Sequence, residues 1–176
     1  MTDLSAALRT AIRDVADFPK PGIVFKDITP VLRDARLFGR STTAMAEPFR
    51  TMGITHVVAI ESRGFIFGAP VAQTLGAAFV PMRKPGKLPF LTEREEYDLE
   101  YGKDALEVHR DAMARDARAL IVDDVLATGG TAGAACRLAE RFGVRVVACA
   151  FLIELAFLKG RGKLGNRDVR ALVTYE

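Results

Sequence analysis

The stretch Leu120-Ile-Val-Asp-Asp-Val-Leu-Ala-Thr-Gly-Gly-Thr-Ala-Gly133 decides the fold of this chain. The apolar, β-branched residues 119–122 are typical of a strand buried on both faces of a parallel sheet. Two carboxylates, Asp123 and Asp124, follow them, and after a glycine-containing turn the Ala- and Leu-rich residues 132–142 predict a helix. In open α/β sheets, ligands bind beyond the carboxyl ends of the strands, so we expect both acids to face a binding crevice.

The turn between this strand and this helix has the composition of a phosphate-binding loop. Backbone N–H groups and hydroxyls at a helix N-terminus favour a phosphate dianion. The run is not a P-loop, because no Gly-Lys-Ser/Thr follows its glycines, and it lacks the G-x-G-x-x-G spacing of a dinucleotide fingerprint. A strand, turn and helix without ligand function is the alternative, but two acids at the end of a buried strand are costly to desolvate without partners. Acids for sugar hydroxyls beside a phosphate cradle predict a sugar phosphate, held by Asp123, Asp124, Ala127, Thr128, Gly129, Gly130 and Thr131.

The rest of the chain alternates strands with helices. The spacing of Leu4, Leu8, Ile12 and Val15 predicts an amphipathic first helix. This alternation implies βαβ units, and hence one α/β domain over residues 1–176 with a mostly parallel twisted sheet flanked by helices. Further strands are predicted at 56–60, 78–82, 144–155 and 169–175, helices at 35–52 and 64–75, and a charged hairpin or mobile loop at 92–108.

Composition excludes several classes of protein. The 176 residues are 49% hydrophobic and 27% charged, and a net charge of +3 without a block of like charge gives no reason to expect a nucleic-acid partner. The longest apolar runs are too short to span a bilayer, and the N-terminus lacks the pattern of a signal peptide. Two lone histidines make a zinc site unexpected. Cys136 and Cys149 are interpreted as buried thiols of a reducing compartment, so we expect a cytoplasmic protein without membrane contact.

Two further segments suggest that the ligand carries more than one phosphate group. Residues 60–64 end one predicted strand and open the next helix, so Arg63 and free helix N–H groups could hold a second anion. Arg83, Lys84 and Lys87 follow another strand of the same sheet. A surface arginine and a solvated charge run are the alternatives, yet both segments fall at the edge that carries Asp123. Such cations would neutralise a departing pyrophosphate.

Three further segments indicate a function less specifically. In the loop at residues 21–30 a flat heteroaromatic ring could stack on Phe25, while backbone groups of Val24 and Lys26 contact its edge. Ordinary core packing of this loop is the alternative. The acidic residues 96–102 suit a soluble lid, and their charge alone does not indicate catalysis. Residues 159–163 are interpreted as a surface turn.

In this order the segments resemble the type I phosphoribosyltransferases, and over nearly the whole chain they resemble the branch of that family that acts on adenine. The resemblance implies transfer of the 5-phosphoribosyl group of 5-phosphoribosyl 1-pyrophosphate (PRPP) to N9 of adenine, giving AMP and pyrophosphate. It also implies magnesium bound through PRPP and water and a homodimer. The matching pieces are Phe18-Pro19, Pro21-Gly-Ile-Val-Phe-Lys-Asp-Ile-Thr-Pro30, Glu61-Ser-Arg-Gly-Phe65, Arg83-Lys-Pro-Gly-Lys-Leu-Pro89, Glu96-Tyr-Asp-Leu-Glu-Tyr-Gly-Lys103, residues 122–131, Glu154-Leu155 and Leu158-Lys-Gly-Arg161.

The same resemblance assigns roles to residues. Asp123 and Asp124 match acids that bind the ribose hydroxyls, and residues 127–131 match the loop that holds the 5′-phosphate. Glu100, on the flexible hairpin at 92–110, matches an acid that interacts with N7 of the base. The N-terminal residues 1–34 match a helix and the base-binding loop. The resemblance assigns pyrophosphate binding to Ser62 and Arg63, with a cis peptide bond between Glu61 and Ser62. It also assigns pyrophosphate contacts to Arg83, Lys84 and Lys87, in part from a neighbouring subunit. Adenine binding is assigned to Val24, Phe25 and Lys26, with Leu126 on the opposite face of the ring.

The sequence departs from the common pattern of the family at two places, and two rival functions remain. Glu61 stands where relatives often have Asp, and Phe90-Leu91 replace more polar residues. A PRPP-sensing regulator would need a DNA-binding domain, and we expect the roughly twenty residues before the base-binding loop to be too few for one. A related enzyme for xanthine, hypoxanthine or guanine is the other rival, because the polar contact that reads the substituent at C6 is not visible in the sequence.

Overall fold

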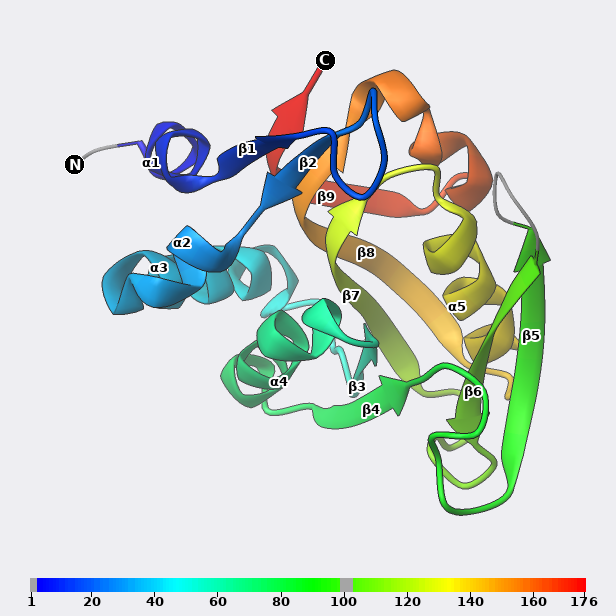
Figure 1. Ribbon diagram of the computed structural model, residues 1–176. Coiled ribbons are helices and arrows are strands. Elements are labelled where there is room, and N and C mark those ends of the chain that lie inside the picture. The colour runs from blue at the N-terminus through cyan, green and yellow to red at the C-terminus, as the bar shows by residue number, and fades with distance from the viewer. Residues whose placement is uncertain (1–2, 99–102) are drawn as a thin grey trace.

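The central sheet is built from the apolar segments that the sequence predicts as strands. The structure is a computed structural model that describes residues 3–98 and 103–176. Every pairing within the sheet is parallel, which confirms the expected α/β architecture (Figure 1). The strand order is β4 (Ala78–Met82), β3 (His56–Ile60), β7 (Arg118–Leu126), β8 (Arg145–Leu155) and β9 (Asp168–Tyr175).

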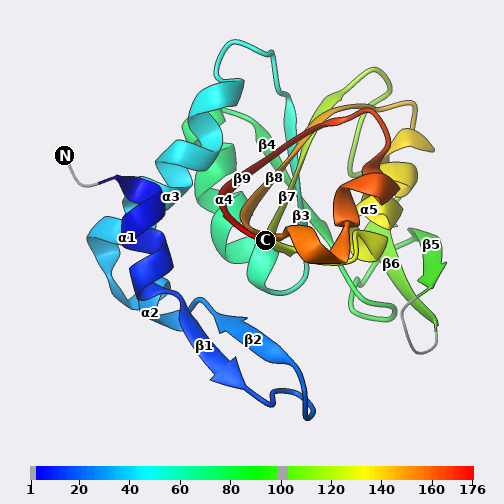
Figure 2. The same ribbon diagram turned by 90° about the horizontal axis from the view of Figure 1, so that it is seen from above.

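Helices cover both faces of this sheet (Figures 1 and 2). On one face lie α3 (Ala35–Ala46) and α4 (Arg63–Leu75). On the other face lies α5 (Gly130–Glu140), flanked by the antiparallel hairpin of β5 (Thr92–Asp98) and β6 (Lys103–His109). The predicted hairpin is therefore confirmed. None of the described helices is long and apolar enough to cross a membrane.

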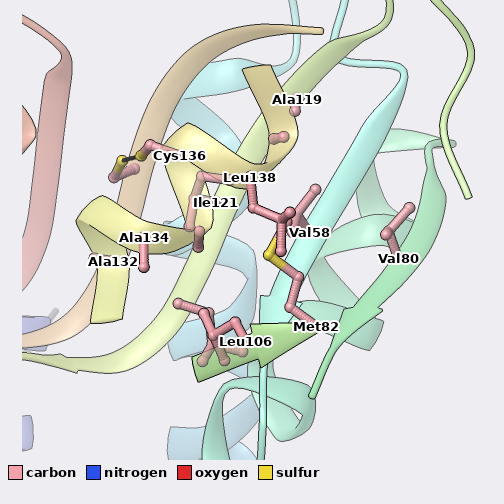
Figure 3. Packing of buried hydrophobic residues seen from close by; sticks show 14 of the residues in the cluster. Val58, Val80, Met82, Leu106, Ala119, Ile121, Ala132, Ala134, Cys136 and Leu138 are labelled. Carbon is pink, nitrogen blue, oxygen red and sulfur yellow. Dashed lines mark hydrogen bonds between the residues drawn. The ribbon is translucent and has the colours of Figure 1, made fainter. Parts of the chain in front are cut away.

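The sheet separates two hydrophobic layers, because alternate residues of a strand point to opposite faces. Towards α5, Val58 and Ile121 pack with Leu138, as Figure 3 shows, and the hairpin adds Leu106. Towards α3 and α4, the neighbouring residues of the same strands pack with helical side chains. Residues 57–60 and 119–122 are at most 1% exposed, as expected for strands buried on both faces.

The two cysteines lie in the layer beneath α5. Cys136 of α5 and Cys149 of β8 are both buried free thiols, as predicted, and their sulfur atoms are 3.6 Å apart.

The N-terminal segment differs from the prediction. Helix α1 (Leu4–Ala11) ends four residues before Val15, and β1 (Arg13–Ala16) pairs with β2 (Val24–Asp27) in an antiparallel hairpin. The helical spacing of four apolar residues could not reveal this strand, because β1 is defined by its pairing with β2. The short helix α2 (Thr29–Arg33) follows.

Three other boundaries are corrected. The helix predicted to reach residue 52 ends at Ala46, and Pro48 lies in the 3₁₀ helix η1 (Glu47–Phe49). Strand β7 continues through Asp123 and Asp124, so the acids lie within the strand and not after it. The surface turn predicted at 159–163 is exposed except for Gly160, and from Gly160 onward it forms the 3₁₀ helix η3 (Gly160–Leu164), which follows η2 (Ala156–Leu158).

Candidate active site

A cavity of about 510 Å³ opens at the carboxyl edge of the sheet, where the sequence predicts a ligand. It is bounded by the segments that follow β3 and β4, by the end of β7 and by the start of α5, together with the β1–β2 hairpin and the end of β8. Its lining residues are Ile23, Val24, Phe25, Lys26, Glu61, Ser62, Arg63, Lys84, Asp123, Asp124, Val125, Ala127, Thr131, Leu155 and Leu158.

The acid pair of β7 lies in the wall of this cavity. Asp124 is 5% exposed and forms an ion pair with Arg63, with 2.5 Å between Oδ2 and Nε. The carboxylate of Asp123 accepts a hydrogen bond from the backbone N–H of Asp124 at 2.9 Å. Burial, with a further contribution from the charge of Asp124, raises the pKa of Asp123 well above its usual value. Two adjacent acids held in this way have oxygen atoms available for vicinal hydroxyls of a sugar.

Helix α4 can approach these acids only because residue 64 is glycine. A Cβ atom there would lie 2.8 Å from Oδ1 of Asp123 and 3.0 Å from the carbonyl oxygen of Val122. Gly64 therefore brings the N-terminus of α4, with Ser62 and Arg63, beside the acid pair. The peptide bond between Glu61 and Ser62 is cis, as the resemblance implied.

Residues 127–131 form a separate small cradle at the N-terminus of α5. The loop encloses a cavity of about 70 Å³, and Gly129 has a φ of +76°, which a residue with a Cβ rarely adopts. The first N–H groups of a helix have no partner within it, so those of Gly130 and Thr131 are available to an anion. The loop has the geometry that the sequence predicted for a phosphate site.

The cradle is supported from behind by a segment that sequence reasoning missed. A Cβ atom on Gly129 would lie 2.2 Å from the carbonyl oxygen of Gly160, and one on Gly160 would lie 2.2 Å from that of Ala127. Arg161 anchors this segment through two 2.6 Å hydrogen bonds to the buried carboxylate of Glu154. An acid that ends an apolar strand needs a partner, and this was the available signal.

The predicted basic loop divides into two parts. Lys84 reaches the cavity, whereas Arg83 and Lys87 do not line it and instead bond to the carboxylate of Glu61. Burial would raise the pKa of Glu61, but hydrogen bonds from Lys87, the backbone N–H of Lys84 and Arg83 hold it below its usual value. Of the three cations, only Lys84 lines the cavity, whereas Arg83 and Lys87 are both paired with Glu61.

Lys84 is held by the hairpin. Its ammonium donates to the carboxylate of Asp104 and, at 2.9 Å, to the hydroxyl of Tyr97. Burial alone would lower the pKa of Lys84, but these two bonds raise it, so the side chain is charged at neutral pH. Sequence reasoning missed both hairpin partners.

An aromatic face formed by Phe25 is another part of the cavity wall. Phe25 of β2 stacks edge-on against Phe18, with 5.1 Å between ring centroids, and the guanidinium of Arg63 lies 5.1 Å from the Phe25 centroid. Val24 is 52% exposed, and the side chain of Lys26 is bound to Asp14 at 2.6 Å. These positions suit a stacked ring contacted at its edge by backbone groups.

One predicted base contact is misplaced by a single residue. Leu126 is 1% exposed and belongs to the core beneath α5, so it does not face the aromatic ring of Phe25. Val125 lines the cavity instead. The prediction ended the strand at residue 122, whereas β7 runs on to Leu126, and its alternation puts Val125 on the exposed side. Glu100 lies outside the described residues.

Comparison with known proteins identifies the family. The family described as Phosphoribosyl transferase domain matches residues 33–169. The adenine phosphoribosyltransferase of Myxococcus xanthus is 56% identical over 174 residues, which cover 99% of this chain and 95% of that protein. The chain belongs to the adenine phosphoribosyltransferase family. It is therefore a transferase, and the resemblance stated from the sequence is confirmed.

Solved structures of the family share the whole fold. The adenine phosphoribosyltransferase of Rhodothermus marinus superposes with a TM-score of 0.93 at 53% identity, covering 98% of each chain. That of Saccharomyces cerevisiae, solved with adenine and an imino-altritol bisphosphate, gives 0.92 at 39% identity and covers 98% of this chain and 99% of its own. The family fold is thus confirmed over the 98% of the chain that these structures cover.

Proposed function

We propose that this protein transfers the 5-phosphoribosyl group of PRPP to N9 of adenine, forming AMP and pyrophosphate in purine salvage. One observation carries the proposal: the acid pair, a charged lysine and an aromatic face line one cavity at the carboxyl edge of the sheet, and the adjoining phosphate cradle shares Asp123, Val125, Ala127 and Thr131 with that cavity. The family supports adenine as the base, since the relative from Myxococcus xanthus bears that name and the yeast structure contains adenine.

PRPP would span the acid pair and the cradle. The 5′-phosphate would accept hydrogen bonds from the loop at 127–131, while Asp123 and Asp124 accept hydrogen bonds from the ribose hydroxyls. Asp124 is at present paired with Arg63. Binding of the sugar would require this pair to separate, and the anionic pyrophosphate beside it offers Arg63 a replacement partner.

The cations near Arg63 would hold the pyrophosphate. Ser62 and Arg63 stand at the N-terminus of α4, and Lys84 lines the same cavity. Arg83 and Lys87 would join them after leaving Glu61, either within one subunit or across a dimer. As the bond to pyrophosphate breaks, these charges stabilise the leaving group.

Adenine would stack on Phe25, with Val125 on its opposite face and backbone groups of Val24 and Lys26 at its edge. Departure of pyrophosphate leaves an oxocarbenium-like ribose, and N9 then attacks the anomeric carbon from the opposite face. Glu100 would hydrogen bond to N7 and so help N9 lose its proton.

Magnesium is the proposed cofactor. Within the described residues no cluster of three or more His, Cys, Asp or Glu side chains could chelate a metal ion, so the ligands would be pyrophosphate and ribose oxygens with water. When bound in this way the ion neutralises charge on the leaving group. The acid pair suits this arrangement because it would contact the ribose hydroxyls and leave the pyrophosphate to the cations.

A homodimer and a cytoplasmic location complete the proposal. Large apolar side chains are exposed around the edge strand β4 and the basic loop, which supports contact with a second copy. They are Phe79 (38% exposed), Ile66 (38%), Phe90 (59%) and Leu91 (59%). Sedimentation equilibrium of the purified protein tests this, and a monomer at micromolar concentration would refute it. The cytoplasm is proposed because PRPP and adenine salvage belong to metabolism inside the cell and both thiols are free.

A substrate panel tests the activity. Purified protein is incubated with magnesium, PRPP and, in turn, adenine, hypoxanthine, guanine and xanthine, and nucleotide formation is followed. We expect AMP with adenine alone, and its loss when the metal is chelated. Product with another base would correct the substrate, and product with none would favour a PRPP-binding regulator.

A further inference from the structure

The hydroxyl of Tyr97 joins the two phosphate-binding parts of the site. Tyr97 lies on β5, is 6% exposed and packs in the core beneath α5. Its oxygen accepts hydrogen bonds from Nζ of Lys84 at 2.9 Å and from Oγ1 of Thr131 at 3.3 Å, and it donates to Oδ2 of Asp104 at 3.2 Å. Lys84 belongs to the basic loop after β4, and Thr131 belongs to the phosphate cradle.

We propose that Tyr97 is a positioning residue that fixes the distance between the pyrophosphate site and the 5′-phosphate site. The assignment deepens the proposed function and depends on it, because the two sites are defined by PRPP. PRPP carries its two anionic groups at opposite ends of one ribose, so it can use both sites only at one spacing. A hydroxyl bonded to Lys84 and Thr131 together sets that spacing.

The hairpin that carries Tyr97 is fixed to the helix that begins at the cradle. Asp104 is the cross-strand partner of Tyr97, so both groups that hold Lys84 come from one register of the hairpin. Further along β5, Glu95 is 7% exposed and bonds to Arg137 of α5 and to Arg141, which caps the C-terminus of that helix. The hairpin and α5 lie side by side (Figure 1). Tyr97 therefore fixes the position of Lys84 relative to α5, the helix that carries Thr131.

Removal of the Tyr97 hydroxyl should weaken the binding of phosphate-bearing ligands and leave the binding of adenine unchanged. In Tyr97→Phe the ring still fills its place in the core, and Lys84 keeps Asp104 as its partner. One ordinary hydrogen bond is worth roughly a factor of 2 to 10 in binding. We expect the dissociation constants of AMP, which uses the cradle, and of pyrophosphate, which uses Lys84, each to rise about threefold. For PRPP, which needs both sites at once, we expect the KM to rise about tenfold, the product of the two effects.

The matched control is Ser41→Ala. Ser41 is fully buried on α3, in the opposite hydrophobic layer, and donates to the carbonyl oxygen of Leu37 at 2.7 Å. This variant also loses one buried hydroxyl and should show a similar fall in Tm, with unchanged KM for PRPP and adenine. It thereby separates general destabilisation from an effect on positioning.

The experiment measures initial rates with PRPP and adenine varied separately, and titrates AMP and pyrophosphate by calorimetry, for wild type and both variants. A selective rise in the KM for PRPP in Tyr97→Phe, with the KM for adenine within twofold of wild type, supports the assignment. An unchanged KM for PRPP overturns it, as does a parallel change in every constant. In both cases AMP formation by the wild type leaves the proposed function standing. A wild type that makes no AMP instead refutes the transferase proposal itself.

Discussion

Replacement of Gly160 by alanine tests whether the segment behind the phosphate cradle shapes it. The new Cβ would lie 2.2 Å from the carbonyl oxygen of Ala127 and 3.0 Å from the nitrogen of Gly129, whereas ordinary contact begins at 3.4 Å. Arg161 is pinned to Glu154 by two hydrogen bonds. We therefore expect the loop to move, by roughly 1 Å.

A displacement of that size has a calculable effect on catalysis. Misplacement of a binding group by about 1 Å can reduce the rate of an enzyme about a hundredfold. At 1.36 kcal/mol for each factor of ten, this corresponds to about 2.7 kcal/mol of lost transition-state stabilisation. For Gly160→Ala we expect a fall of about a hundredfold in kcat/KM for PRPP. The KM for adenine should change little, since Phe25 does not line the small cradle that Gly160 supports.

Gly162→Ala is the control from the same 3₁₀ helix. A Cβ at residue 162 would meet nothing within 4 Å, so this variant should keep wild-type kinetics. Steady-state rates with PRPP varied at saturating adenine, together with Tm, are measured for both proteins. If Gly160→Ala retains a kcat/KM for PRPP within threefold of Gly162→Ala, the reasoning about the cradle is wrong.

Three further predictions concern the base contact, the acid pair and Glu100. Val125→Ala should raise the KM for adenine about threefold to tenfold with little loss of stability, whereas Leu126→Ala should lower the free energy of unfolding by about 2 to 5 kcal/mol and leave that KM unchanged; the reverse pattern would restore the original assignment of Leu126. Burial and Asp124 raise the pKa of Asp123 above its usual 3.8, so the folded protein retains a proton that the unfolded chain releases, and the stability from this group is present below pH 3.8 and is lost as the pH rises through the folded pKa. Asp123→Asn should therefore have a higher Tm than wild type at pH 8, a difference that shrinks towards pH 4, and should lose AMP formation; a lower Tm at pH 8 would contradict this. Glu100→Gln should reduce kcat by about ten-squared to ten-fourth-fold with the KM for PRPP nearly kept, and an unchanged kcat would exclude Glu100 from the chemistry.

The local parts of the site were predictable from the sequence. Strands β3 and β4 have the predicted boundaries, and the acids Asp123 and Asp124 and the loop at 127–131 occupy the expected edge of the sheet. Each of these depends on neighbouring residues: apolar runs give buried strands, carboxylates at a strand end need polar partners, and small residues expose N–H groups. Their relative placement follows from the parallel sheet, which gathers the ends of its strands at one edge.

Other features were decided by contacts between distant segments. The sequence shows Gly160 only as part of a charged turn, and it shows Tyr97 only as an aromatic residue in an acidic hairpin. Their roles arise because Gly160 touches Ala127 and the hydroxyl of Tyr97 meets Lys84 and Thr131. No local pattern encodes contacts between residues more than ten positions apart, since they depend on how helices and strands pack.

The end of β7 shows most clearly which features the sequence determined and which depended on the tertiary structure. The sequence by itself determined that a strand, an acid pair and a phosphate loop follow one another, because each depends on local composition. Only the tertiary structure decided that Val125 borders the cavity while Leu126 enters the core. Pairing with β8 continues as far as Leu126, and successive residues of a strand point to opposite faces, so Val125 faces the cavity and Leu126 faces the core.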